Sequence, residues 1–424
     1  MIKKVNGFLD KNSVIIFNIF LLMQPFLDVV VSLFNHHGTS PNLIFIIKVL
    51  FLFYTIYYLV FIKKRNIKYL ILIFLYSVVF VLVNYFSKDN GNIFFEIESL
   101  VKVVYFPIVL LFVLDVVKSK KISIKNLIIT LCLYLALIIV PDMLNVGFDS
   151  YLYDKEGIIG LFYSANAVGN IISILMPVVV SYLFKNKKII YLVLFLIIYF
   201  YTLLMMGTKA PLLTALILVL YYFILLIIKL VKNKKYTHIA LLMLLVFIML
   251  VLLVKFLPLT SFYKNMVIHA QNMEVKSVRD LLSLDKFDDY IFSGRLSFLS
   301  DSFKVYNDSS ILQKLFGIGY VMDGKLLKTS EMDYFVVLVH HGIVGFIVLY
   351  YKYFEILFLT FKNYFSALKK NFNNYEITSV VIAVITSILN AMLAGHCLDV
   401  PSVCVFVAAI IGYAYVMLVS KKES

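Results

Sequence analysis

Long apolar runs constrain this chain more than any other feature of its sequence. A transmembrane α-helix needs roughly 17 to 25 mostly apolar residues, and about twelve runs meet that requirement. Hydrophobic residues make up 62% of the 424 residues, a share that does not fit a domain folded in water. We therefore expect an all-α fold, a polytopic membrane helix bundle of about 12 transmembrane helices. The runs cover residues 14–34, 42–62, 68–86, 99–117, 124–141, 157–184, 189–206, 210–230, 237–257, 333–354, 375–394 and 398–419.

Lysine and arginine are distributed unevenly over the connections between these runs. They gather at both termini and in alternate connections such as 63–65 and 185–188, whereas the short connections between hold only Lys88, Lys155 and Lys209. Positively charged loops stay in the cytoplasm, so the pattern predicts a protein of the cell membrane with both termini cytoplasmic. It also explains the net charge of +15 as a topology signal, and we expect no nucleic-acid partner.

One connection, residues 258–332, is much longer than the others, and the alternation places it outside the cytoplasm. Loops of this length are usually functional or disordered. Apolar residues recur at helical spacing over 266–281 and again over 296–306, the second stretch following a Ser293-Gly294 start. We expect short amphipathic helices lying along the outer membrane surface. Residues 1–424 are predicted to form a single integral membrane domain that includes this external loop.

Charged residues within or beside membrane spans are costly and are therefore candidates for function. Several basic residues on the predicted outer side would suit a phosphate or pyrophosphate, which needs fixed positive charge in a site of low dielectric constant. Lys48 and Lys102 have a plainer alternative, in which their ammonium groups reach up to the lipid headgroups. The basic candidates are Lys48, Lys102, Lys209, Arg279 and Arg295, and the acidic members of the same set are Asp28, Glu331, Asp333 and Asp399.

Arg279 and Arg295 differ from the other candidates because the chain has only three arginines among many lysines. A guanidinium holds a phosphate or a carboxylate with paired hydrogen bonds, which an ammonium cannot do. The alternative is that each arginine makes a salt bridge at the rim of the loop, with Asp280, Asp285 or Asp301 as its partner.

Glu331 and Asp333 open the tenth apolar run. In Ser330-Glu331-Met332-Asp333 they have the spacing of a capping box, which is a structural role at a helix start. The functional alternative is that Glu331 acts as a general base toward a hydroxyl, with Asp333 in the substrate-binding site. His341 lies further along the same run. A packed, hydrogen-bonded histidine is the favoured interpretation there, and substrate binding by His341 is the alternative.

Several common active-site signatures are missing from the sequence. It has no phosphate-cradling glycine loop, no paired CxxC, no HExxH and no GxSxG. Cys132, Cys397 and Cys404 have no metal-ligand spacing with any histidine, and we interpret them as small core residues. We therefore expect neither a metal site nor a cofactor.

Six short stretches of the chain stand out together: GLFYSANAVG at 160–169, MGTKA at 206–210, FSGR at 292–295, LFGIG at 315–319, EMDYF at 331–335 and GIVG at 342–345. In their order and spacing they resemble the O-antigen polymerase and O-antigen ligase superfamily. The resemblance implies a metal-independent glycosyltransferase that moves a glycan from an undecaprenyl pyrophosphate donor to a hydroxyl, at the outer face of the membrane. Members of the superfamily commonly have Ser-Arg where this chain has Thr208-Lys209, and ligase-type members have His in place of Glu331. The second difference favours a polymerase.

The sequence therefore predicts a polymerase that joins lipid-linked oligosaccharide repeat units into a surface polysaccharide such as a capsule. Glu331 would assist deprotonation, while Lys209, Arg279 and Arg295 would bear the charge of the leaving group. The alternatives are ligase-like transfer to another acceptor and a transporter or flippase of lipid-linked saccharides. A carrier commonly has two similar halves, and none are visible here. Expected partners are the undecaprenyl-pyrophosphate-linked oligosaccharide, membrane lipid, a flippase and a chain-length regulator.

Overall fold

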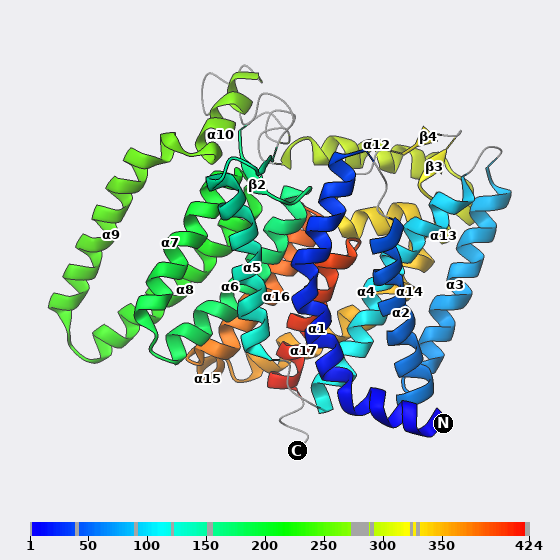
Figure 1. Cartoon of the computed structure of the whole chain (residues 1–424), viewed down its shortest axis with the longest axis horizontal. Coiled ribbons are helices and arrows are strands. Elements are labelled where there is room, and N and C mark those ends of the chain that lie inside the picture. Colours follow the sequence, from blue (N-terminus) through cyan, green and yellow to red (C-terminus); the bar gives the residue numbers. More distant parts are fainter. Residues whose placement is uncertain are drawn as a thin grey trace.

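The computed structural model of the chain describes residues 2–38, 42–88, 92–119, 123–150, 156–272, 288, 292–322, 325–327 and 331–419. Long helices lie side by side, and α1 begins at the same end of the bundle as α17 finishes (Figure 1). The first half comprises α1 (Ile2–His36), α2 (Asn42–Tyr57), the π-helix η1 (Tyr58–Lys63), α3 (Ile67–Phe86), α4 (Ile93–Ser119), α5 (Ile124–Met143), β1 (Phe148–Asp149), β2 (Ile158–Gly160), α6 (Ala165–Lys185) and α7 (Ile189–Met206). The second half comprises α8 (Ala210–Lys232), α9 (Tyr236–Phe256), the 3₁₀ turn η2 (Leu257–Leu259), α10 (Ser261–Asn272), α12 (Arg295–Asp308), α13 (Ile311–Phe316), β3 (Val321–Met322), β4 (Lys325–Leu326), α14 (Asp333–Ser366), α15 (Leu368–Phe372), α16 (Tyr375–Leu393) and α17 (Pro401–Leu418).

The predicted all-α membrane bundle is confirmed. Within the described ranges, eleven helices are long and apolar enough to cross a membrane, and they correspond to eleven of the predicted runs. The remaining predicted run, 237–257, corresponds to α9, an apolar helix of 21 residues. In Figure 1 α9 stands at the edge of the molecule, and its neighbour along the bundle is α8.

The helices divide into a buried group and a lipid-facing group. In α4 and α6, 83% of the residues in the most apolar stretch are buried, against 28% in α7 and α8. α17 packs along α4, and α16 packs along α6. These four helices form the centre of the bundle, and the loop between α16 and α17 is therefore held by the best-packed part of the molecule.

Two predicted spans differ from the observed helices. The run at 157–184 begins as a strand, because Ile158–Gly160 pairs with Phe148–Asp149, and the helix starts only after Ser164, whose hydroxyl accepts from the Ala167 N–H at 3.3 Å. The run at 333–354 continues as α14 to Ser366 and contains a break at Gly342, where φ is +70°. Hydropathy identifies apolar stretches long enough to cross a membrane. It does not show where a strand replaces a helix or where a helix is broken.

The described part of the long loop folds onto the bundle, with α10 against α7, and α12 and α13 against α14. α12 matches the second predicted amphipathic helix. α10 covers the start of the first predicted stretch, whose remainder from residue 273 lies outside the described residues. α13 and the β3–β4 hairpin were not predicted. Gly294 precedes α12 as predicted, but the cap is the carboxylate of Asp288, which accepts from the N–H groups of Leu296 at 2.9 Å and Ser297 at 2.8 Å.

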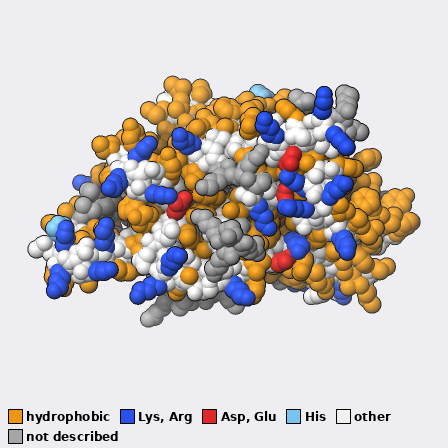
Figure 2. All heavy atoms as spheres, turned by 90° about the horizontal axis from the view of Figure 1, so that it is seen from below, with side chains coloured by type: hydrophobic (Ala, Val, Ile, Leu, Met, Phe, Trp, Pro, Cys, Tyr) orange, Lys and Arg blue, Asp and Glu red, His pale blue; other side chains and the backbone are white. Residues whose placement is uncertain are grey.

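The opposite end of the bundle is basic. Figure 2 looks at the face where α1 begins, and lysine and arginine side chains predominate over acidic ones there. This is the end that carries the connections predicted to be cytoplasmic. The long loop lies at the other end, together with β2 and the start of α14 (Figure 1).

Candidate functional site

The segment after α13 is inserted into the break of α14. The Gly319 N–H donates to the His340 carbonyl at 3.0 Å, and the His340 Nδ1 donates to the Gly319 carbonyl at 2.5 Å. A Cβ at Gly342 would lie 2.5 Å from the Leu315 carbonyl carbon, so only glycine permits this approach. The glycine motif at 317–319 thus has a structural role, which is to place the following residues over the bundle.

A buried carboxylate fixes the next turn of the chain. Glu96, 1% exposed, accepts from the backbone N–H groups of Tyr320 and Val321 at 2.9 Å and from Lys88 Nζ at 2.7 Å. Sequence reasoning missed this residue, although a glutamate at the edge of an apolar run is the signal that could have identified it. Its ion pair and hydrogen bonds compensate for the burial of its charge.

Glu331 makes contacts that the predicted capping box does not contain. It precedes α14 with φ of +61°, and the N-cap residue is Met332, which makes no side-chain capping bond. The capping-box prediction is therefore wrong. Glu331 Oε2 instead accepts from Arg295 Nη2 at 2.8 Å and Nε at 3.3 Å, and it lies 3.8 Å from His396 Nε2. Arg295 is thus paired with Glu331. Of the aspartates considered as its partners, Asp301 pairs with Lys304, and Asp280 and Asp285 lie outside the described residues.

The charges of this cluster are strongly coupled. The His396 imidazole and the Arg295 guanidinium lower the pKa of Glu331 to about 2 against the opposing effect of burial. Burial disfavours charge on His396, but Glu331, Asp399 and Asp333 raise the pKa of that imidazole to about 9. At neutral pH the cluster therefore holds a carboxylate between two cations. His396 was not predicted, and no pattern in its own stretch of sequence marks it.

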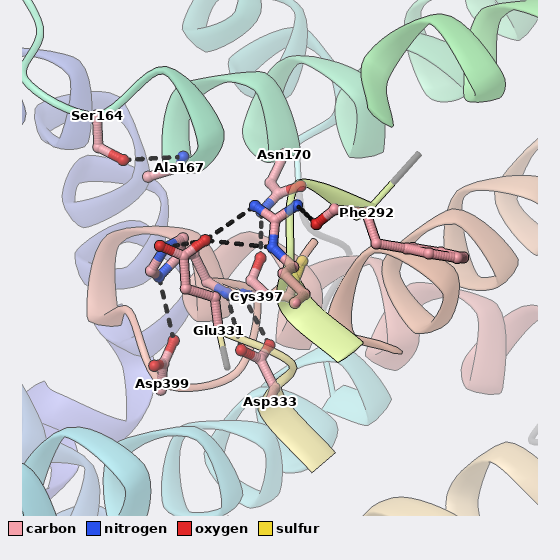
Figure 3. Close-up of polar contacts among 11 residues, drawn as sticks. Ser164, Ala167, Asn170, Phe292, Glu331, Asp333, Cys397 and Asp399 are labelled. Carbon is pink, nitrogen blue, oxygen red and sulfur yellow. Dashed lines mark hydrogen bonds and ion pairs between the residues drawn. The ribbon is translucent and has the colours of Figure 1, made fainter. Parts of the chain in front are cut away.

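Asp333 shapes the loop that carries His396. Its carboxylate is buried and accepts from the backbone N–H groups of His396 at 2.8 Å and of Cys397 and Leu398 at 2.9 Å. Figure 3 shows Glu331, Asp333 and Asp399 gathered around this loop. These contacts give Asp333 a positioning role, and the predicted binding of substrate by Asp333 stays a prediction. A carboxylate that accepts three N–H bonds holds the loop in one conformation.

Helix α6 contacts the loop that carries His396 and also packs against the turn between α7 and α8, which contains Lys209. Asn170 Nδ2 donates to the Gly395 carbonyl at 2.7 Å, and Figure 3 shows Asn170 approaching the loop from α6. A Cβ at the preceding residue, Gly169, would lie 2.9 Å from Pro211 Cγ. The turn between α7 and α8, where Lys209 is half-buried, therefore packs one residue away from Asn170. The turn between α7 and α8 lies at the same end of the molecule as α12 (Figure 1).

Lys48 and Lys102 each have an acidic partner. Lys48 Nζ lies 3.4 Å from Asp28 Oδ1, and the Tyr134 hydroxyl donates to the other Asp28 oxygen at 2.7 Å. The Lys48 side chain is only 12% exposed, so it does not extend to the headgroups. Lys102 pairs with Glu98 at 2.7 Å, remains 39% exposed, and lines a cavity beside the loop that follows α16.

His341 lies in the core, and both of its ring nitrogens are occupied. Nδ1 lies 3.0 Å from the Tyr76 hydroxyl, Nε2 lies 3.0 Å from the Tyr320 hydroxyl, and the ring stacks on Phe80. These contacts match the packed, hydrogen-bonded alternative and leave no ring nitrogen for a substrate. Arg279 lies outside the described residues.

No group of three His, Cys, Asp or Glu residues is arranged to hold a metal ion within the described ranges. The arrangement consists of a cationic pair, Arg295 and His396, around Glu331, with Asp399 on the far side of the imidazole at 4.0 Å from Nδ1. Such a site can bind an anionic group and can present carboxylates to a hydroxyl.

Comparison with known proteins gives one family. The profile of the family described as O-antigen ligase like membrane protein matches residues 11–281 and 277–421. No curated protein and no solved structure matches the chain.

Proposed function

Because the chain belongs to the O-antigen ligase-like family of membrane proteins, we propose that it joins undecaprenyl-pyrophosphate-linked repeat units into a surface polysaccharide. The observation that carries this proposal is the pair of cations, Arg295 and His396, placed around Glu331 where the long loop meets α14 and α17. A pyrophosphate leaving group needs such fixed positive charge. On the predicted topology the site faces outward.

Arg295 is suited to the leaving group because of how its guanidinium is held. Its side chain is 16% exposed, and it donates to Glu331 through Nε and Nη2 and to the Phe292 carbonyl through Nη1 at 3.2 Å. A guanidinium carries five N–H donors, so these contacts orient it while it still donates to a phosphate. Lys209 and Arg279 are proposed as further cations for the same group.

The proposed reaction is an inverting transfer. The acceptor hydroxyl oxygen attacks the anomeric carbon of the donor sugar, and the bond from that carbon to the pyrophosphate oxygen breaks. Glu331 was predicted as the base that takes the hydroxyl proton. A pKa of about 2 makes a carboxylate a weak base, so we favour a role in which Glu331 holds Arg295 and His396 in place.

A polymerase is preferred over a ligase because the position of Glu331 carries His in ligase-type members of the superfamily. Here that position supplies a carboxylate to Arg295, and the imidazole comes from His396, which lies 65 residues later in the chain. Transport without chemistry would not require a guanidinium oriented by three contacts.

Reconstitution tests the function and separates the alternatives. Vesicles that contain the purified protein and lipid-linked repeat units should form a ladder of longer glycans on the lipid carrier. Transfer only to an added second acceptor would identify a ligase. Movement of the donor between leaflets without bond formation would identify a transporter. A matched vesicle preparation with Asp308→Asn, an exposed change at the end of α12, should behave as the wild type does.

A further inference from the structure

We propose that Asp399 and the cavity beside it form the acceptor subsite, where the Asp399 carboxylate takes the proton from a sugar hydroxyl. This inference rests on the proposed glycan transfer. It assigns the acid–base step to a residue other than Glu331 and gives the acceptor a place in the fold.

The cavity has the size and lining of a site for one sugar ring. Its volume is about 240 Å³, which is below the roughly 300–1,000 Å³ of sites for larger organic ligands. Apolar and aromatic side chains line it together with a few polar groups, as in other small-molecule sites. The lining residues are Phe95, Ser99, Lys102, Val103, Tyr320, Leu326, Leu327 and Asp399. The remaining sugars of a repeat unit would extend from its mouth.

Separate parts of the chain build this cavity, and each has been fixed by contacts described above. α4 contributes the wall that includes Ser99 and Lys102. The segment after Gly319, anchored by Glu96 through the Tyr320 N–H, contributes a second wall. The loop between α16 and α17, held by Asp333, contributes Asp399. The subsite is therefore preorganised.

Asp399 has an oxygen that lacks a partner. Its Oδ1 is buried and accepts no hydrogen bond from the residues that the structure describes. The nearest cationic group is His396 Nδ1 at 4.0 Å, which is beyond hydrogen-bond length. A buried acceptor without a partner is unfavourable and needs a specific explanation. The Asp399 side chain is nevertheless 30% exposed and lines the cavity, so a hydroxyl that enters the cavity can reach its carboxylate and form a hydrogen bond.

Asp399 is a better candidate for the base than Glu331 because no guanidinium holds it. Glu331 accepts twice from Arg295, whereas the only cation within 4.0 Å of Asp399 among the described residues is the His396 imidazole. His396 thus separates a donor side, with Arg295 and Glu331, from an acceptor side, with Asp399 and the cavity. The two reacting groups would meet at this imidazole.

The proposed step balances. The acceptor O–H proton moves to the Asp399 carboxylate as the acceptor oxygen forms its bond to the anomeric carbon. The bond from that carbon to the pyrophosphate oxygen breaks, and its electron pair leaves with undecaprenyl pyrophosphate. The Asp399 proton is then released to water, so no other reactant is needed.

Asp399→Asn tests the inference in the reconstituted vesicles. Loss of the base should lower polymer formation by roughly 10²–10⁴-fold, while binding of the lipid-linked donor, measured by native mass spectrometry, should remain. Asp301→Asn is the control, because Asp301 is an exposed residue of α12 paired only with Lys304 among its described neighbours. An active Asp399→Asn protein with wild-type turnover would overturn the proposal.

A second variant tests the cavity without touching the carboxylate. Ser99→Phe should fill the space and weaken saturation by acceptor while donor binding is retained. Unchanged acceptor dependence in a folded Ser99→Phe protein would show that the acceptor lies elsewhere. If the wild-type protein forms no ladder, the proposed function is wrong. If the wild-type protein and the Asp399→Asn protein are both active, the proposed function stands and only the role of Asp399 is wrong.

Discussion

Glu331 and Asp399 lie on opposite sides of the His396 imidazole and differ in what else holds them. Glu331 has a guanidinium on its other side, with two hydrogen bonds to one oxygen. Asp399 has a cavity on its other side and a buried oxygen without a partner in the described structure. A carboxylate paired with two cations is a good positioning group and a weak base. Asp399 has no guanidinium partner among the described residues, and it is the carboxylate that lines the cavity.

The largest expected effect on the donor side comes from Arg295→Ala. Removing one group that stabilises developing charge lowers turnover by about 10²–10³-fold, and we expect that loss here with a weaker affinity for the lipid-linked donor. Arg295→Lys should recover part of the activity, because it keeps the charge and loses the paired hydrogen bonds. Steady-state rates at varied donor concentration measure both effects.

The control for Arg295→Ala is Lys304→Ala on the same helix, which removes an exposed pair with Asp301 and should leave the rates unchanged. Equal donor affinity in the Arg295→Ala and wild-type proteins would contradict the assignment of a donor side.

The pH dependence tests the cation shared by the two sides. Glu331, Asp399 and Asp333 face His396 and raise its pKa to about 9, above the usual histidine value of about 6.5. The contribution of the imidazolium is therefore complete below pH 6.5 and is lost as the pH rises through about 9. One unit above the pKa, about a tenth of the imidazole remains charged, so we expect donor binding to fall about tenfold at pH 10. A titration of binding without any decline above pH 9 would remove His396 from the donor site.

Glu331→Gln is expected to have a smaller effect than Arg295→Ala or a rise in pH to 10. It removes the charge from an ion pair in which the Glu331 side chain is 42% exposed. Such exposed pairs contribute up to about 1 kcal/mol, which corresponds to roughly fivefold in rate. Because Glu331 contributes to the raised pKa of His396, the high-pH limb of the binding profile should also move to lower pH. If Glu331 is the base, the rate should instead fall by roughly 10²–10⁴-fold with no shift of that limb.

The membrane spans could be predicted from the sequence and the contacts within the site could not, and this difference has a physical cause. Spans could be predicted because the bilayer imposes a length and an apolar composition on each helix. Arg295 and Glu331 stood out locally, one by its rarity and the other at the edge of an apolar run. Their pairing, however, joins residues that are 36 positions apart in the chain. His396 comes from a different loop, and the conformation of that loop depends on Asp333. No periodicity encodes such contacts.

The glycine motifs illustrate the same limit. Gly342 allows Leu315 of α13 to approach α14 closely. The break in α14 at that position also requires φ of +70°, a conformation that glycine adopts without strain. The sequence marks the residue, but it does not reveal that another segment of the chain enters the helix there.

The smallest expected effect is on the acceptor side, from Lys102→Met. Lys102 lines the same cavity as Asp399, yet it is 39% exposed and already pairs with Glu98, which is 47% exposed. Exposed ion pairs contribute about 0.2–1 kcal/mol, so losing a contact of this kind should raise the acceptor KM by about threefold and leave donor binding unchanged. Glu98→Gln is the matched control, because it removes the same ion pair and keeps the ammonium at the cavity. If Glu98→Gln raises the acceptor KM as much as Lys102→Met does, the ion pair and not the ammonium is responsible. A loss of donor binding in Lys102→Met would instead mean that the two sides of His396 are not separate.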